Sequence, residues 1–366
     1  MEIFKKIILS PFSLLYGLAV SLRNLLFDLG ILTSEEFNLP VICVGNLTAG
    51  GTGKTPHVEY LAEMLKDYFQ VAVLSRGYKR KTKGFLLADE NPDPSRLGDE
   101  ACQVKKKYPD ILVAVDEKRA RGIRRLMEMN PSPEVILLDD AFQHRYVKAG
   151  LNILLMDYNR PYHKDMLLPS GRMREPVASK KRAQFILVTK SPPELKPIEM
   201  RLIARDMKLD EFQYLYFTMM RNENPGPVFE DTALLPGEFP DHGPNILLVS
   251  GIANPERFRS LARNYSENIH ECIFRDHHDY QARDISRIKS AFDRIEGDKI
   301  ILTTEKDAVK LRTFGQELER LKDKMFYLPI RVSFLNNDGD IFKNQILTYV
   351  RDNKRDSILH KEKSKL

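Results

Sequence analysis

The sequence contains few cysteines and no large excess of charge of either sign. Its three cysteines among 366 residues lie far apart, without CxxC spacing: Cys43, Cys102 and Cys272. This pattern predicts neither a disulfide framework nor a zinc site, and it fits a reducing, cytosolic setting. Lysine and arginine number 57 against 51 acidic residues, a net charge of +6, which argues against a dedicated nucleic-acid binder. With 42% hydrophobic residues, the chain is not disordered and suffices for one large domain or two ordinary ones.

A long run without charged residues lies near the start of the chain. Between Lys6 and Arg23 the sequence has 16 uncharged residues, fewer than the ~20 that a spanning helix needs, and the run includes Pro11. No small-residue cleavage site follows, so we do not expect a cleaved signal peptide. Residues 1–32 are therefore expected to form an amphipathic helix or helix pair. Composition leaves open whether it packs on the domain or lies in a membrane interface.

The rest of the chain alternates strand-length apolar runs with helical patterns, which is typical of a parallel sheet covered by helices. Strands are expected in two series, 41–44, 71–74, 111–115, 135–139, 152–156 and 185–189, then 214–218, 246–250, 300–304 and 325–328. We predict an α/β fold with a core lobe at 33–210 and a second, smaller α/β lobe at 211–350. A basic tail at 351–366 is expected to be disordered.

The first expected strand leads into a glycine-rich loop, GNLTAGGTGKT (residues 45–55), and then into a helical pattern. This strand, loop and helix order is the context that a nucleotide-binding P-loop requires. Its backbone N–H groups would surround phosphates, the Lys54 side chain would reach them, and the Thr55 hydroxyl would hold Mg²⁺. One position departs from the pattern, because Thr48 stands where the first P-loop glycine is expected; Gly50 and Gly51 can supply the turn instead. The phosphate-binding set is Thr48, Ala49, Gly50, Gly51, Thr52, Gly53, Lys54 and Thr55.

A P-loop also needs an acidic partner for the metal, usually at the end of a neighbouring strand. The run at 135–138 ends in Asp139 and Asp140, and strand ends of this kind face the ligand site of open α/β sheets. We therefore expect at least one of the two to reach Mg²⁺, although either could instead cap a turn.

Two other acidic clusters stand out, Gly98-Asp99-Glu100 and Asp276-His277-His278-Asp279. A carboxylate near a histidine can take a proton from a hydroxyl group. A histidine pair of this kind is equally typical of a surface loop or a metal site.

Taken together, these motifs resemble the tetraacyldisaccharide 4'-kinase family. The resemblance covers about residues 1–330 and rests on motifs in a fixed order: GNLTAGGTGKTP (45–56), SRGY (75–78), GDE (98–100), DDAFQH (139–144), LLPSGR (167–172), DHH (276–278) and TEKD (304–307). It implies two α/β/α lobes, the first built on a P-loop sheet, joined by a small β hinge, with an N-terminal helix in the membrane interface.

The resemblance also implies the reaction and the roles of residues. The family uses ATP and Mg²⁺ to phosphorylate the 4'-hydroxyl of a tetraacyldisaccharide 1-phosphate, giving the lipid A precursor lipid IVA. By this resemblance Asp99 is the base and His277 its partner, while Glu100 and Asp139 join Thr55 as metal ligands. Supporting roles fall to Asp140, Gln143, His144, Arg76, Arg172 and Asp276. The chain has Ala101 and Ala141 where the family usually has proline and glycine, and neither change removes a functional side chain.

A lipid acceptor implies a place for the protein in the cell. We expect a peripheral, monotopic enzyme on the cytoplasmic face of the bacterial inner membrane, with no nucleic-acid partner and no obligate protein partner. Basic clusters at 76–83, 118–125 and 172–182 are either attracted to anionic lipid or the substrate's phosphate, or are ordinary solvated surface.

Two other functions share the P-loop. One is a GTPase-type switch, but the chain lacks an Asn-Lys-x-Asp guanine motif, which residues 304–307 resemble only loosely. The other is an ATP-dependent kinase acting on a different small molecule. Turnover of a lipid acceptor with ATP would distinguish the lipid kinase from both of these alternatives.

Overall fold

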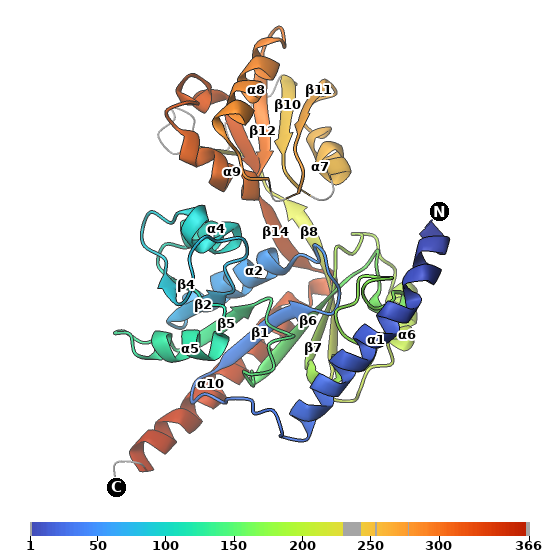
Figure 1. The fold of residues 1–366 in the computed structure, drawn as a ribbon. Helices are drawn as coiled ribbons and strands as arrows, with labels where there is room; N and C mark the ends of the chain where they lie inside the picture. The colour runs from blue at the N-terminus through green and yellow to red at the C-terminus, as the bar shows by residue number, and fades with distance from the viewer. Residues whose placement is uncertain (1, 230–242, 253–254, 277, 364–366) are drawn as a thin grey trace. The chain divides into compact units, whose positions relative to one another are not determined.

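The computed structural model describes residues 2–229, 243–252, 255–276 and 278–363 (Figure 1). The chain divides into two compact units, each with its own sheet. The first comprises Met1–Leu97, Val104–Met220 and Val332–Leu366, and the second comprises Gly98–Gln103 and Arg221–Arg331. The α/β fold class predicted from the sequence is confirmed.

The first unit is built on a mostly parallel sheet in which, within the described residues, the order is β14-β8-β7-β6-β1-β5-β2-β4-β3. Its strands are β1 (Val41–Asn46), β2 (Val71–Ser75), β3 (Leu86–Leu87), β4 (Leu112–Val115), β5 (Val135–Asp139), β6 (Leu151–Asp157), β7 (Phe185–Thr189), β8 (Tyr214–Asn222) and β14 (Ile330–Phe334). All six residues of β1 are buried, as expected for a central strand covered on both faces.

Helices cover both faces of this sheet. They are α1 (Glu2–Asp28), α2 (Lys54–Lys66), α3 (Pro94–Leu97), α5 (Arg119–Met127), α6 (Pro197–Met207) and α10 (Gly339–Lys363), while α4 (Asp99–Lys107) begins in the residues grouped with the second unit. On one face Tyr60 of α2 and Phe342 of α10 lie 6.4 Å apart between ring centroids. On the other, Glu35 in the segment after α1 forms an ion pair with Arg124 of α5.

The second unit has its own sheet, with the order β11-β10-β12-β13-β9 in its described part. The elements are β9 (Gly226–Pro227), β10 (Asn245–Ser250), β11 (Ile269–Ile273), β12 (Lys299–Thr304), β13 (Met325–Leu328), α7 (Pro255–Ala262), α8 (Ala282–Asp293) and α9 (Glu305–Leu311). Alternate residues of β10 enter two different apolar clusters: Ile246 and Leu248 pack with α7, whereas Leu247 and Val249 pack with α8 and α9. This alternation is the two-residue period of a strand covered on both faces.

The structure differs from the expected boundaries at the C-terminal end. Residues 211–350 were expected to form one lobe, but β14 joins the first sheet beside β8, and Val332–Leu366 groups with the first unit. Phe342 is fully buried there, 5.5 Å from Phe185 of β7. The helix α10 also continues to Lys363, through most of the tail at 351–366 that was expected to be disordered. No glycine or proline interrupts the helix after Gly339, so nothing in the sequence ends it.

Candidate active site

The P-loop lies between the end of β1 and the start of α2, as the sequence predicted. Gly50 and Gly53 have φ angles of +115° and +85°, a region that favours glycine. Thr48, at the position of the missing glycine, forms an antiparallel bridge with Met173, so the chain is still extended there. The turn therefore falls two residues later, at Gly50, which explains how the loop tolerates Thr48.

The carboxylates that follow β5 lie beside this loop. The parallel register pairs Val44 with Asp139, which places the ends of β1 and β5 side by side. The Asp140 carboxylate is 3.7 Å from the Lys54 ammonium and 2.9 Å from the Arg174 guanidinium. Burial tends to raise the pKa of Asp140, but Lys54 and Arg174 outweigh this effect and hold the pKa below its usual value. Asp140 is therefore an anion held next to the P-loop lysine.

Asp139 occupies a different environment from Asp140. It is buried, with 4% exposure, and its backbone carbonyl lies 3.3 Å from the Arg119 guanidinium. Arg119 is itself 2% exposed; burial lowers its pKa to about 10, while Asp139 and Asp140 act in the opposite direction. Thr55 is half-buried in the first turn of α2. Asp139 therefore lies beside the strand that leads into the loop, and Thr55 is the last residue of the loop.

The two residues after Ala141–Phe142 complete the surroundings of Asp140. The Gln143 side chain donates to the Asn46 carbonyl at 2.8 Å. Burial, followed by the charges of Arg119 and Arg76, lowers the pKa of His144 to about 4, so its imidazole is neutral at physiological pH. Gln143 and His144 therefore lie close to the end of β5.

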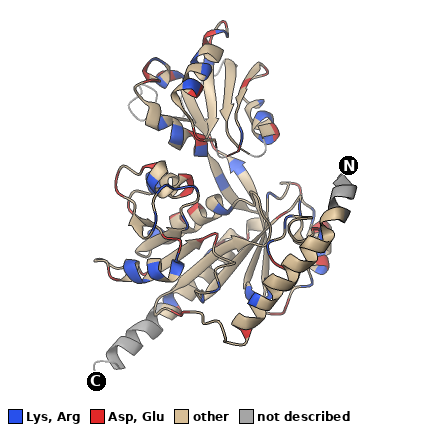
Figure 2. Ribbon diagram, viewed as in Figure 1, with Lys and Arg blue, Asp and Glu red and all other residues tan. Residues whose placement is uncertain are grey.

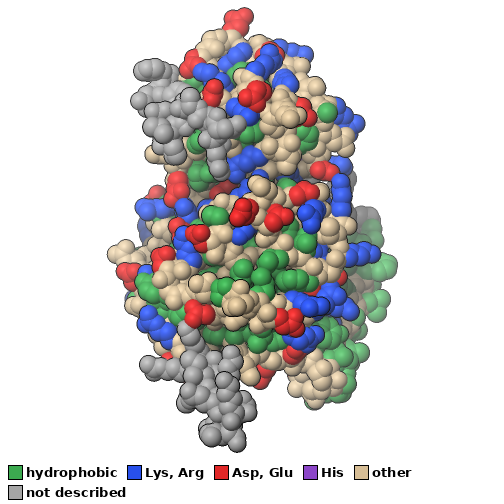
Figure 3. Space-filling view, turned by 90° about the vertical axis from the view of Figure 1, so that its left-hand side faces the viewer, with side chains coloured by type: hydrophobic (Ala, Val, Ile, Leu, Met, Phe, Trp, Pro, Cys, Tyr) green, Lys and Arg blue, Asp and Glu red, His purple; other side chains and the backbone are tan. Residues whose placement is uncertain are grey.

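Two arginines of the predicted set lie at the edge of the site and are exposed. The Arg172 carbonyl accepts a hydrogen bond from the Ala49 N–H at 2.7 Å, and its guanidinium lies near Gly50. Arg76 is exposed and contributes to the charge around His144. On the face drawn in Figure 3, basic and acidic side chains are interspersed, and no single-sign patch covers it.

A second cluster lies in the other unit and contains Asp99. The Asp99 carboxylate is 2.7 Å from the Lys310 ammonium, which also donates to the His278 carbonyl at 2.8 Å. Burial lowers the pKa of Lys306, and the nearby carboxylates of Asp276, Asp99 and Glu100 oppose that effect. Lys306 and Lys310, one turn apart on α9, therefore lie near two carboxylates of the predicted site. These are Asp99, the predicted base, and Glu100, a predicted metal ligand. His277, the predicted partner of Asp99, lies outside the described residues.

The TEKD motif (304–307) positions these lysines. The Thr304 hydroxyl accepts from the Asp307 N–H at 3.1 Å and so caps the start of α9. The Asp307 carboxylate accepts from the Gly251 N–H at 2.9 Å. Nearby, the His278 Nε2 lies 2.9 Å from the Asp284 carboxylate. The motif therefore fixes one end of α9 to the end of β10.

The N-terminal helix α1 has one packed face and one exposed apolar face. The Ser13 hydroxyl contacts Ser170 at 2.8 Å, the Tyr16 hydroxyl donates to the Arg174 carbonyl at 2.9 Å, and Arg23 donates to the Gln143 carbonyl at 2.9 Å. Exposed apolar side chains, each at least half exposed, are Ile8, Phe12, Leu14, Leu15, Leu18, Leu22 and Leu25. In Figure 2 the coloured part of the helix is almost free of charged side chains. Residues Ile8–Asp28 are also long and apolar enough to cross a membrane, by length and composition alone.

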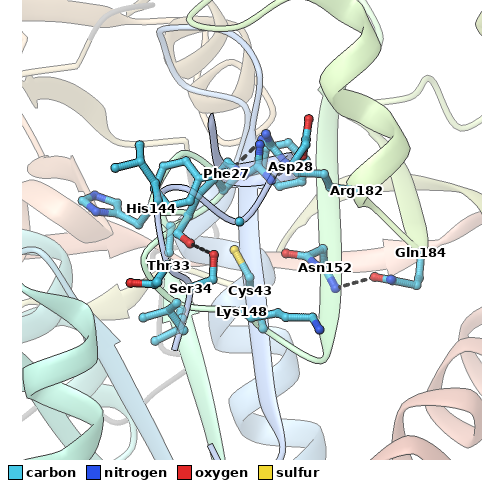
Figure 4. A pocket seen from close by; sticks show the side chains of 18 residues that line it. Phe27, Asp28, Thr33, Ser34, Cys43, His144, Lys148, Asn152, Arg182 and Gln184 are labelled. Atoms are coloured by element: carbon cyan, nitrogen blue, oxygen red, sulfur yellow. Dashed lines mark hydrogen bonds and ion pairs between the residues drawn. The ribbon is translucent and has the colours of Figure 1, made fainter. Parts of the chain in front are cut away.

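A pocket of about 640 Å³ lies in the first unit, between the end of α1 and the loop after β5 (Figure 4). Its lining includes three cationic side chains, and each has an acidic partner: Arg145 pairs with Asp28, Arg182 with Glu175, and Lys148 with Glu36. The P-loop does not contribute to the lining. With its charges balanced, this pocket is not a ready-made anion site.

Sequence reasoning missed four residues that the fold places at the two clusters. Arg174 and Lys310 bind the two acidic residues described above, Asn46 accepts from Arg174 and donates to the Thr52 hydroxyl at 2.7 Å, and Arg119 is buried beside Asp139. Asn46 was detectable as a polar residue at the end of a buried strand. The three basic residues lay within or beside charge-rich segments, where nothing in the sequence separates a buried cation from a solvated one.

Comparison with known proteins agrees with the resemblance seen in the sequence. A family model described as tetraacyldisaccharide-1-P 4'-kinase (LpxK) matches residues 5–351. A tetraacyldisaccharide 4'-kinase of Bacteroides fragilis is 49% identical over 360 residues, covering 97% of this chain and 96% of that protein. One from Porphyromonas gingivalis is 41% identical over 356 residues, covering 94% and 98%.

Among solved structures, LpxK from Aquifex aeolicus, crystallised in complex with ATP, has a TM-score of 0.74 and 31% identity. The match covers 94% of this chain and 99% of that one. Both the sequence and the fold therefore place the chain among lipid kinases rather than GTPase switches. The chain belongs to the tetraacyldisaccharide-1-P 4'-kinase family.

Proposed function

We propose that this protein transfers the γ-phosphate of ATP to the 4'-hydroxyl of a tetraacyldisaccharide 1-phosphate at the cytoplasmic face of the inner membrane, giving lipid IVA. The observation that carries the proposal is the P-loop lysine, Lys54, placed 3.7 Å from the Asp140 carboxylate at the end of the adjacent strand. Phosphoryl transfer depends mostly on positioning and charge, which this arrangement supplies. Family membership supports the choice of acceptor.

The residues of the first unit fit a nucleotide with a metal ion. A Cβ built on Gly51 would meet no atom within 4 Å, so the loop borders open space where phosphates can approach its backbone. The chemistry that a bound Mg²⁺ would supply here is positive charge that stabilises the phosphates. No group of three potential metal ligands occurs in the part of the chain that the structure describes. Thr55 and Asp139 are the proposed ligands, with Glu100 as a third.

The acceptor's proton needs a base, and we assign that role to Asp99. Its carboxylate is 17% exposed and forms an ion pair with Lys310, which fixes its direction. An ionised carboxylate can accept the proton of the 4'-hydroxyl as the new P–O bond forms. His277 is proposed as its partner, with Asp276 beside it. Arg76 and Arg172 are proposed to bind the anionic acceptor, since both are exposed near the P-loop unit's site.

The helix α1 is proposed to lie in the membrane interface rather than to cross the bilayer. Hydrogen bonds from Ser13, Tyr16 and Arg23 hold one face of the helix against the protein. The opposite face exposes leucines, which fits shallow insertion among lipid headgroups. The acceptor's acyl chains would then remain in the bilayer while its sugar is presented to the enzyme.

The reaction is tested by incubating the full-length protein with radiolabelled ATP or GTP and with purified tetraacyldisaccharide 1-phosphate. Label is expected in the lipid only with ATP and acceptor together. Tight GTP binding without acceptor turnover would instead indicate a switch, and turnover of an unrelated sugar would indicate a different kinase.

Membrane binding is tested by replacing two leucines on the exposed face of α1. Leu15→Asp with Leu22→Asp should lower the fraction sedimenting with anionic liposomes about tenfold or more, because two apolar anchors become charged. A matched control is Ile198→Asp with Leu202→Asp, an exposed apolar pair on α6. If both double variants lose liposome binding equally, α1 is not the anchor.

A further inference from the structure

Three consecutive carbonyl groups of the P-loop are each bound by a side chain from outside the loop. The Lys190 ammonium donates to the Gly51 carbonyl. The Thr189 hydroxyl lies 2.8 Å from the Thr52 carbonyl oxygen, and the His57 Nδ1 lies 2.7 Å from the Gly53 carbonyl oxygen. None of these side-chain contacts follows from the P-loop motif itself.

Two of the donors come from the end of β7. Thr189 is its last residue and is fully buried; its hydroxyl has one proton, and its other acceptor, the Met156 carbonyl, is farther away at 3.3 Å. Lys190 follows with a φ of +57°, and its ammonium is also held by the Asp157 carboxylate at 2.6 Å. The donors are therefore fixed by the sheet rather than by the loop.

The third donor, His57, is one turn into α2 and is 1% exposed. Burial lowers the pKa of His57 to about 4, so the ring is neutral at physiological pH. Its Nε2 lies 3.0 Å from the hydroxyl of Thr218, which is fully buried. The tautomer with the proton on Nδ1 satisfies both contacts, since Nδ1–H donates to Gly53 and Nε2 accepts from Thr218.

These contacts determine which way the loop's N–H groups point. In a trans peptide the C=O and the following N–H point in opposite directions. When the carbonyls of Thr52 and Gly53 are held toward β7 and α2, the N–H groups of Gly53 and Lys54 face away from those elements. Groups fixed in this way before a ligand arrives bind an anion without the cost of ordering the loop.

We propose that Thr189, Lys190 and His57 are positioning residues for nucleotide binding, which hold the P-loop carbonyls back and thereby aim its N–H groups at the phosphates of ATP. The inference rests on the proposed function in so far as ATP is the ligand. It adds to the phosphate-binding motif a supporting set from β7 and α2. Loss of one such contact should weaken ATP binding without affecting the lipid.

The first test uses the full-length protein with Thr189→Val, which removes the hydroxyl while keeping the shape, and Thr189→Ser, which restores it. Thr303→Val is the matched control, because Thr303 is also fully buried and its hydroxyl donates to a strand carbonyl, that of Val249 at 2.7 Å. The Kd for Mg-ATP, the KM values for ATP and lipid, and the melting temperature are measured for each variant.

We expect Thr189→Val to raise the Kd for ATP about five- to tenfold, the typical loss for one buried hydrogen bond. The serine variant and the control should stay within about twofold of wild type by the same measure, with the KM for lipid unchanged. Unaltered ATP binding in Thr189→Val, or an equal rise in both KM values, overturns the inference. A wild-type protein that binds no ATP overturns the proposed function as well, so the two failures are distinct.

The second test addresses Lys190. Lys190→Met alone leaves the Asp157 carboxylate without its ammonium, so it is compared with Lys190→Met in an Asp157→Asn background. Both should bind ATP more weakly by a similar factor, whereas restored affinity in the double variant would show that the unpaired carboxylate caused the loss. Lys299→Met is the control, since the Lys299 ammonium also donates to a backbone carbonyl, that of Phe292 at 2.9 Å, in the other unit.

Discussion

The P-loop in the first unit and the Asp99 cluster in the second are held by different kinds of interaction. The P-loop is fixed largely by buried, uncharged donors such as Asn46 and Thr189, both fully buried. Asp99 is held by the ammonium of Lys310, an ion pair whose side chains keep 17% and 9% exposure. Hydrogen bonds between neutral groups change little with pH, whereas an ion pair responds to pH and to the loss of one partner. The contacts that Asn46 and Thr189 make should therefore depend less on pH than the ion pair between Asp99 and Lys310.

The largest expected effect is at Lys54. Lys54→Ala removes the cation that stabilises charge on the transferred phosphate, and kcat should fall by about 10³-fold or more. The fold should survive, because Lys54 begins a helix and Asp140 keeps Arg174 as a partner. The control is Lys66→Ala at the exposed other end of α2, which should keep full activity. A kcat near wild type in Lys54→Ala would remove the P-loop from the mechanism.

Asp99→Ala sharpens the comparison, because it removes the base without touching the P-loop. We expect kcat to fall about 10²–10⁴-fold while the KM for ATP changes little, since a positioned base contributes that much to proton transfer. His277→Ala should lower kcat by a similar factor. The kcat of the double variant should be only slightly lower than that of either single variant.

The control variant is Asp89→Asn, at an exposed acidic residue of the first unit, and it should leave kcat unchanged. Fully multiplicative losses in the double variant of Asp99 and His277 would mean independent roles for these two residues. Asp99 would then no longer form a catalytic pair with His277.

A third prediction concerns the acid stability of the first unit. The pKa of His57 is about 4 in the folded protein, against about 6.5 unfolded, so the unfolded chain binds one more proton between these values. The stability that His57 contributes is present above pH 6.5 and is lost as the pH falls toward 4. At pH 5 the loss should be about 2 kcal/mol.

Urea unfolding between pH 7.5 and 5 measures this loss. His57→Gln keeps a donor for the Gly53 carbonyl but does not titrate, so its stability should depend less on pH by that amount. Equal pH dependence in the two proteins would show that His57 is not the titrating group.

The smallest expected effect is at Lys310. Lys310→Met should lower kcat about five- to tenfold at neutral pH, because Asp99 loses one of its fixed partners. The acid limb of the pH profile should also move to higher pH, since a carboxylate without a neighbouring cation is protonated more readily. Lys310→Arg should recover part of both changes. A profile in Lys310→Met that is lowered uniformly, without a shift, would contradict an electrostatic role for Lys310.

Much of the first unit's site could be predicted from the sequence. The residues of β1, the glycine loop and α2 are consecutive, and the buried strand β5 ends in Asp139 in both the prediction and the structure. Strand position alone then implies that Asp139 and Asp140 lie beside the loop, because parallel strands bring their carboxyl ends to one edge. The family resemblance added Asp99, which no local pattern had distinguished from a surface carboxylate.

The missed strands show where such reasoning stops. β14 (Ile330–Phe334) was not expected, and it carries the C-terminal helix back to the first unit. Its neighbour β8 is more than a hundred residues earlier in the chain, and no periodicity within either strand specifies the other. Pairing over such a distance depends on how all the intervening elements pack.

The sequence by itself therefore determined the α/β class, the P-loop and its acidic neighbours, and the apolar character of α1. Each of these features depends on consecutive residues or on a short-range hydrophobic period. Only the tertiary structure decided that Arg174 binds Asp140, that Lys310 binds Asp99, and that Thr189 and His57 hold the loop's carbonyls. It also decided which face of α1 is packed. The physical reason is that a side chain's partner depends on burial and distance in the folded chain. The local sequence around a residue does not specify which distant residue it will contact.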